Sequence, residues 1–87
     1  MARLDENLSK QNKVKAIEEM IQIVLLRIPK EVEAMHFYKK AAEKSTTKEA
    51  QELFLSLAQQ EKGHEAELRR ILQDLKEELK NIKGDLS

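Results

Sequence analysis

The sequence has 87 residues, of which sixteen are basic and sixteen acidic, with two glycines, one proline and no cysteine. The balanced charge argues against a nucleic-acid binder that relies on a net basic face, and the lack of cysteine excludes disulfides, thiolate catalysis and Cys-ligated zinc or iron. The longest apolar run, residues 23–26, is too short to cross a membrane, and a composition rich in Leu, Lys, Glu and Ala is typical of an all-α protein.

The first twelve residues are mostly polar, show no sustained hydrophobic period, and are expected to form a flexible arm or a short lead-in. From about Lys13 onward, apolar residues recur at alternating steps of four and three, which predicts an amphipathic helix with a heptad seam. Every member of this seam is apolar or aromatic except one glutamate. The seam consists of Ile17, Ile21, Val24, Ile28, Glu31, Met35, Tyr38 and Ala42.

Pro29 interrupts the first helical pattern. It removes the amide that would bond to the carbonyl of Leu25, and its ring crowds the preceding turn. The heptad seam keeps its phase across the proline, which favours one long kinked helix. The alternative is a break, with Pro29 at the first position of a second segment.

A turn is expected at residues 45–47, where the sequence reads Ser-Thr-Thr. Thr46 followed by Glu49 matches a capping box and predicts that a second helix starts here. Lys83 followed by Gly84 predicts the end of that helix. The second helix has its own heptad seam, which consists of Ala50, Phe54, Leu57, Glu61, His64, Leu68, Ile71, Leu75, Glu78 and Ile82.

The predicted fold is therefore all-α, a long antiparallel helical hairpin in one domain over residues 1–87.

Strongly polar members of the two seams are expected to lie at the same distance from the turn in this hairpin. Glu31 lies 15 residues before Thr46 and Glu61 lies 15 residues after it, so both are expected about 22 Å from the turn at ~1.5 Å per residue. His64 follows one helical turn later on the same face as Glu61. Because a carboxylate in an apolar seam is costly unless a partner or a metal neutralises it, these three residues are the candidate metal ligands.

One such hairpin supplies half of the ligand set of a di-iron carboxylate bundle, in which two helices each give a Glu and the other two each give Glu-x-x-His. Two hairpins related by a two-fold axis supply the full set, which predicts a homodimer that forms a four-helix bundle. Four carboxylates balance two divalent ions, so we expect two iron ions per dimer, with manganese or zinc as alternatives. A single Glu or His in a seam is more often a register-setting polar residue or an exposed edge. The matched level of three such residues favours the metal site.

The same residues carry a resemblance to a known family. The two motifs are Glu31-x-x-Ala34-x-x-x-Tyr38 and Phe54-x-x-Leu57-Ala58-x-x-Glu61-x-x-His64. Together they resemble the rubrerythrin and ferritin-like di-iron proteins over roughly residues 17–75. Within that superfamily, the size and the separation of the two glutamates look most like the encapsulated-ferritin type, whose two-helix chains build the iron site across a subunit interface.

The resemblance implies a role for each matching residue. Glu31 corresponds to a terminal iron ligand, Glu61 to the carboxylate that bridges both irons, and His64 to the nitrogen ligand. Tyr38 matches a tyrosine that hydrogen-bonds a ligating carboxylate. Its alternative role is that of an aromatic core residue.

The leading functional hypothesis is oxidation of Fe(II) with oxygen or peroxide, for iron handling or protection from oxidative stress. Because the sequence has no cysteine, repeated peroxide turnover needs an external electron donor, which favours a ferroxidase over a peroxidase. The alternative is a structural or interaction module, a helical-bundle dimer with a polar layer or adventitious zinc.

The expected partner is a second copy of the chain, in a homodimer or a higher oligomer. The encapsulated-ferritin resemblance adds an encapsulating shell as a further partner. No nucleic acid or membrane partner is expected. No secretory signal is visible at the N-terminus, so we expect a cytoplasmic location. The resemblance implies a location inside a protein compartment as the alternative.

Overall fold

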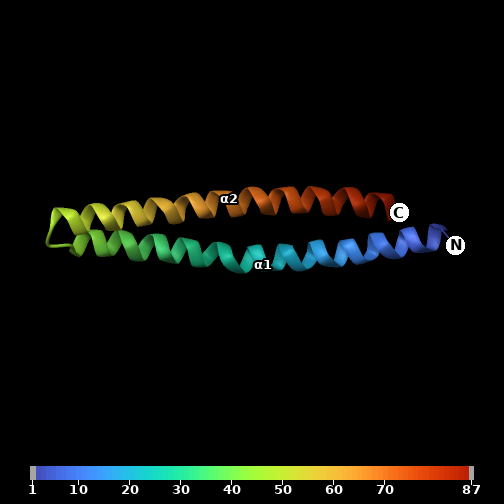
Figure 1. Cartoon of the computed structure of the whole chain (residues 1–87), viewed down its shortest axis with the longest axis horizontal. Coiled ribbons are helices and arrows are strands. Elements are labelled where there is room, and N and C mark those ends of the chain that lie inside the picture. Colours follow the sequence, from blue (N-terminus) through green and yellow to red (C-terminus); the bar gives the residue numbers. More distant parts are fainter. Residues whose placement is uncertain (1, 87) are drawn as a thin grey trace.

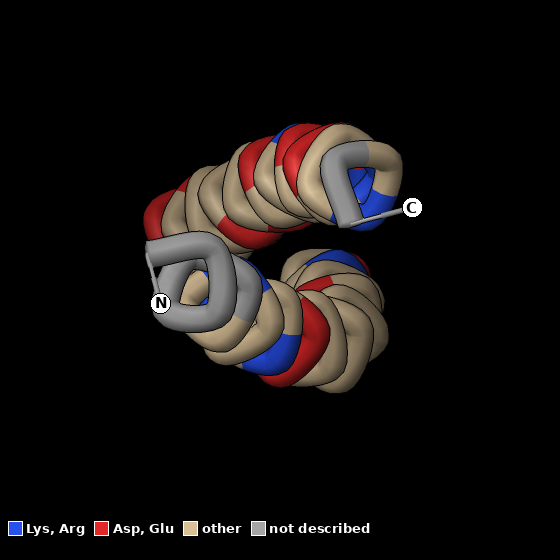
Figure 2. The backbone as a smooth tube through the Cα atoms, turned by 90° about the vertical axis from the view of Figure 1, so that its right-hand side faces the viewer, with Lys and Arg blue, Asp and Glu red and all other residues tan. Residues whose placement is uncertain are grey.

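The chain forms two long antiparallel helices joined by a short turn (Figure 1). The computed structural model describes the backbone of residues 2–86 and the side chains of residues 8–84. Helix α1 spans Ala2–Lys44 and helix α2 spans Lys48–Leu86. The hairpin measures 69 × 15 × 14 Å, and acidic and basic residues occur along both helices (Figure 2). The predicted all-α helical hairpin is confirmed, and none of the described helical segments is long and apolar enough to span a membrane.

The N-terminal boundary of α1 differs from the expected one. The helix begins at Ala2 instead of near Lys13, so the predicted helix start was wrong. Met1 lies outside the described residues. The early residues include Leu, Glu, Lys and Gln, which favour helix, and a formed helix extends easily into such a sequence because propagation costs less than nucleation. The flexibility of this segment stays a prediction.

Pro29 lies inside α1, which continues on both sides of it. The favoured prediction of one long helix is confirmed, and the alternative of a helix break is wrong. Pro29 is exposed and the preceding Leu25 is 43% exposed. Because this part of the helix faces solvent, water can satisfy the carbonyl that loses its bond at the proline.

The turn is closed by hydrogen bonds on both sides. At the end of α1, the Ser45 hydroxyl donates to the Ala41 carbonyl at 2.8 Å. At the start of α2, the Ala50 amide donates to Thr47 Oγ1 at 3.1 Å. The N-cap is therefore Thr47, so the predicted capping box beginning at Thr46 was wrong by one residue.

The C-terminal boundary of α2 also lies beyond the expected one. Gly84 is helical with a negative φ, and α2 continues to Leu86. The predicted stop at Gly84 was wrong because this glycine does not adopt the left-handed conformation of a helix C-cap.

The core is a narrow line between the two helices. Its buried apolar members are Ile17, Val24, Ile28, Ala42 and Ala58. The first heptad seam is therefore confirmed as the face of α1 that meets α2. Along α2, the predicted seam is mostly half-buried, while His64, Ile71 and Glu78 are exposed. Much of the second seam thus lies at the edge of the contact between the helices.

Candidate metal centre

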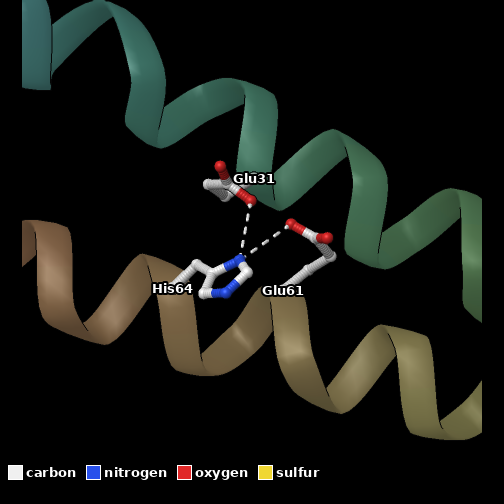
Figure 3. Close-up of side chains that lie close together, drawn as sticks. All are labelled: Glu31, Glu61 and His64. Carbon is white, nitrogen blue, oxygen red and sulfur yellow. Dashed lines mark ion pairs between the residues drawn. The ribbon is translucent and has the colours of Figure 1, made fainter.

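Glu31 of α1 and Glu61 and His64 of α2 lie together in the middle of the hairpin (Figure 3). The Nδ1 atom of His64 lies 3.7 Å from Oε2 of Glu31 and 3.6 Å from Oε2 of Glu61. The three residues can each offer one ligand atom, and these atoms all lie within 4.8 Å of one another. The structure thus brings together all three residues that the sequence singles out as metal ligands.

The cluster is buried on the α1 side and open on the α2 side. Glu31 is 5% exposed and is the buried charged residue of the described core. The side chain of Glu61 is 19% exposed, and that of His64 is 57% exposed. The hairpin therefore covers one carboxylate and leaves much of the imidazole exposed to solvent.

Arg27 is a member of the cluster that the sequence analysis missed. Its Nε donates a 2.7 Å hydrogen bond to Oε1 of Glu31, one helical turn further along α1. This contact leaves Oε2 of Glu31 directed toward His64. The Arg-to-Glu spacing of four residues is the signal that could have revealed it, because such pairs meet on a helix surface.

The two carboxyl groups shift each other's pKa in opposite directions. The pKa of Glu61 is raised, first by its hydrogen bond to Glu31 and then by burial and the negative charge of Glu31. The pKa of Glu31 is lowered by the same hydrogen bond, and the Arg27 guanidinium lowers it further against the opposing effect of burial. The pair therefore favours the neutral form of Glu61 and the ionised form of Glu31, whose charge Arg27 compensates.

Tyr38 lies nearer the turn and packs through its ring. It stacks on Phe54 of α2, with ring centroids 6.4 Å apart, and contacts Phe37 edge-on at 5.6 Å. These contacts support the aromatic packing role. A hydrogen bond from its hydroxyl to a ligating carboxylate stays a prediction.

The residues present fit a divalent metal ion. Ligand atoms around an ion at about 2.1 Å lie about 3.0–3.4 Å apart, slightly closer than the distances from His64 to the two carboxylates. Small side-chain rotations would therefore close the set. Two carboxylates with one imidazole suit iron, manganese or zinc, and a single chain leaves coordination positions open.

Comparisons with known proteins point in the same direction. The family model described as Rubrerythrin matches residues 5–72 and residues 22–85. Both matches contain the complete cluster of Glu31, Glu61 and His64. No curated protein sequence and no solved structure matches the chain.

Proposed function

Because the chain belongs to the rubrerythrin family, we propose that it is a di-iron carboxylate protein whose metal site forms across a homodimer interface and oxidises Fe(II). The observation that carries this proposal is the cluster of Glu31, Glu61 and His64, whose ligand atoms lie within 4.8 Å. With a 57% exposed imidazole, the cluster is open on one side. A second chain on that side would add an equal set of ligands, giving the four carboxylates and two imidazoles of a di-iron bundle.

In this proposal, Glu31 would serve as a terminal ligand, Glu61 as the carboxylate shared by the two ions, and His64 as the nitrogen ligand through Nδ1, which already faces both carboxylates. Bound iron supplies the one-electron redox chemistry. Arg27 orients Glu31 by holding Oε1, so that Oε2 stays directed toward the other ligands. Glu61 must lose its proton to act as a bridge, which couples metal binding to proton release.

Fe(II) is the substrate of the proposed reaction. Two Fe(II) ions lose one electron each, and these two electrons with two protons reduce oxygen to hydrogen peroxide, or peroxide to water. Since the sequence has no cysteine, re-reduction of the iron would need an external electron donor. We therefore propose a ferroxidase in preference to a peroxidase, acting in the cytoplasm or within a protein shell.

A second candidate function is supported by Arg27. The ion pair at 2.7 Å compensates the charge of Glu31, and the raised pKa of Glu61 favours its neutral form, so the cluster can approach neutrality without a metal. Such a neutral polar layer can fix the register of a helical-bundle dimer. In that case the chain is a structural or interaction module, and any bound zinc is adventitious.

The test is anaerobic loading with Fe(II), followed by metal analysis and exposure to air. We expect about one iron per chain, two per four-helix site, and oxidation to Fe(III) that is followed by absorbance. Glu61→Ala should abolish both. The matched control is Glu65→Ala, because Glu65 lies on the same helix and is held by Arg69 at 2.8 Å, outside the cluster.

Two outcomes separate the candidate functions. If Glu61→Ala retains iron binding and oxidation, the assigned cluster is not the site. If the wild-type dimer persists in chelator and oxidises no Fe(II), the structural module is the correct function.

A further inference from the structure

The carboxylate of Glu31 contacts two different partners through its two oxygens. Its Oε2 lies 3.7 Å from Nδ1 of His64 and faces the candidate ligand set (Figure 3). Its Oε1 accepts a 2.7 Å hydrogen bond from Nε of Arg27. An arginine side chain is positively charged at every physiological pH. One carboxylate of the candidate metal centre therefore carries a permanent cation on its other oxygen.

The surroundings of Arg27 direct it to Glu31. Residues three and four positions apart are neighbours on a helix surface. For Arg27, these neighbours are Ile23, Val24, Lys30 and Glu31. Glu31 is the acidic one of the four. On α2, Glu65 lies 19 residues from Thr46, as Arg27 does on α1, and it is already paired with Arg69 at 2.8 Å.

The ion pair of Arg27 and Glu31 is more deeply buried on its acidic side than the pair of Arg69 and Glu65. The side chain of Glu31 is 6% exposed, whereas that of Glu65 is 21% exposed. Charges that are removed from water are screened less, so they act on each other more strongly. The side chain of Arg27 itself is 59% exposed, and water weakens its effect in part. The charge of Arg27 thus acts on the candidate metal centre through a buried carboxylate.

This charge changes the balance between the cluster and a bound ion. When both Glu31 and Glu61 are ionised, one divalent ion per chain neutralises them. With Arg27 included, a divalent ion leaves one excess positive charge per chain, and a trivalent ion leaves two. Excess charge is more costly the larger it is, because the ion and the guanidinium repel each other in proportion to the charge of the ion. Arg27 therefore disfavours a trivalent ion more than a divalent one.

We propose that Arg27 makes the metal centre selective for divalent over trivalent ions, so that Fe(III) is released after oxidation instead of being retained. The inference rests on the proposed function, which supplies Fe(II) as the substrate, and adds the fate of the product. Arg27 acts through Glu31 and is a positioning residue. A centre that releases the oxidised ions can bind further Fe(II), so it turns over instead of holding a resident ferric pair.

A purely structural role for Arg27 makes a different prediction. If the guanidinium only orients Glu31, or only compensates its charge before metal binds, loss of Arg27 should change the affinities for divalent and trivalent ions by the same factor. An effect of charge changes the ratio of the two affinities, because a trivalent ion is repelled by one more unit of charge. This ratio is the quantity that separates the two roles.

Equilibrium binding of two redox-inert ions at pH 7 measures the ratio without any oxidation of iron. Mn(II) replaces Fe(II), and Ga(III), kept in solution with nitrilotriacetate, replaces Fe(III). Arg27→Gln keeps an N–H donor at this position and removes the charge. We expect this variant to bind Ga(III) about tenfold more tightly relative to Mn(II) than the wild type does, as estimated for one unit of charge in a partly screened site.

Two variants are the controls for charge and for location. Arg27→Lys keeps the charge and should keep the wild-type ratio within about threefold. Arg69→Gln removes an arginine from the equally short ion pair with Glu65, outside the cluster, and should also leave the ratio unchanged. Because both arginine side chains are more than half exposed, the variants should keep the helical hairpin, which circular dichroism verifies.

The midpoint potential of bound iron is an independent measurement. A tenfold gain in the preference for Fe(III) in Arg27→Gln should lower this potential by about 59 mV. The proposal is wrong if Arg27→Gln leaves the ratio of affinities and the potential at their wild-type values. It is also wrong if Arg69→Gln changes the ratio as much as Arg27→Gln does.

The same titrations distinguish failure of this inference from failure of the proposed function. If the wild type binds Mn(II) and the ratio is the same in Arg27→Gln, the metal centre remains supported and the selectivity assigned to Arg27 is wrong. If the wild type binds neither Mn(II) nor Ga(III), the metal centre and the role of Arg27 are both wrong.

Discussion

The hairpin differs between its turn-proximal level and the level of the candidate metal centre. At the turn-proximal level, Ala42 is 2% exposed, and Tyr38 stacks on Phe54. At the metal level, the buried residue is Glu31, and its neighbours on α2 are two ionisable groups that are less covered. Both levels bring α1 and α2 into contact, but with different chemistry.

The difference shows which contacts a single hairpin can bury and which it leaves partly exposed. Apolar contacts are stabilised by removal from water alone. A buried carboxylate needs charge compensation on all sides. One hairpin supplies Arg27 to Glu31, and leaves the imidazole of His64 largely exposed. We therefore expect changes near the turn to affect folding and changes at the metal level to affect binding.

The largest expected effect is on metal affinity at the metal level. His64→Ala should weaken Fe(II) binding at least about 100-fold, or ~2.7 kcal/mol, because the cluster loses its nitrogen ligand. Since this side chain is 57% exposed, the free energy of unfolding of the metal-free protein should change by less than about 0.5 kcal/mol. Anaerobic titration and urea unfolding measure the two quantities. His36→Ala, at an exposed position of α1, is the control. If metal-free His64→Ala instead lost much of its free energy of unfolding, the metal level would affect folding as the turn-proximal level does, and the proposed distinction would be wrong.

The converse variant lies near the turn. Phe54→Ala should lower the free energy of unfolding by about 2 kcal/mol, since it removes a half-buried aromatic ring that stacks on Tyr38. Fe(II) affinity of the folded protein should stay within about threefold of wild type. Leu55→Ala, next in sequence and exposed, should change stability by less than about 0.5 kcal/mol. A loss of affinity as large as that of His64→Ala would show that the two levels are coupled.

The sequence predicts the position of the cluster better than its internal contacts. Glu31 and Glu61 could be placed at one level because heptad periodicity and the site of the turn are local signals, and each residue adds a fixed rise. Arg27 could not be assigned in the same way. It lies off the seam, and an arginine one turn before a glutamate is usually a solvated pair.

Helix boundaries were predicted less well, for local reasons. Thr46 and Thr47 are equally suitable N-caps by residue type, and backbone geometry selects Thr47. The segment before Lys13 lacks an apolar seam, so its helical state depends on continuation from the helix that follows. Exposure of His64 and Ile71 could not be read from the seam either, because a wide stripe can face two partners.

A third prediction concerns the raised pKa of Glu61 at the metal level. The raised pKa of Glu61 contributes stability that is fully present below its ordinary value of 4.5 and is lost as the pH rises through the higher folded value. Glu61→Gln replaces the protonated acid by a neutral amide. The metal-free variant should therefore be more stable than wild type at pH 7 and equal to it below pH 4.5, as measured by urea unfolding in chelator.

The control for this prediction is Glu33→Gln, at an exposed position of α1 outside the cluster. Its difference from wild type should be small at both pH values. Glu31 has the opposite sign, since its pKa is lowered: its contribution is present above the ordinary value and is lost as the pH falls through the folded one. Lower stability of Glu61→Gln at pH 7 would contradict the raised pKa of Glu61.

The smallest expected effect is a change in stability without a change in Fe(II) affinity, at a residue of the metal level. Gly63 lies between Glu61 and His64, has no positive φ, and has open space around the position of a Cβ atom. Gly63→Ala should therefore stabilise the metal-free protein by up to about 1 kcal/mol through helix propensity. Fe(II) affinity should not change, because the new methyl group points away from the ligands. Gln59→Ala changes helix propensity little, so an equal gain in stability for that variant would contradict helix propensity as the cause. A loss of affinity at Gly63→Ala would instead show that the segment must flex to bind metal.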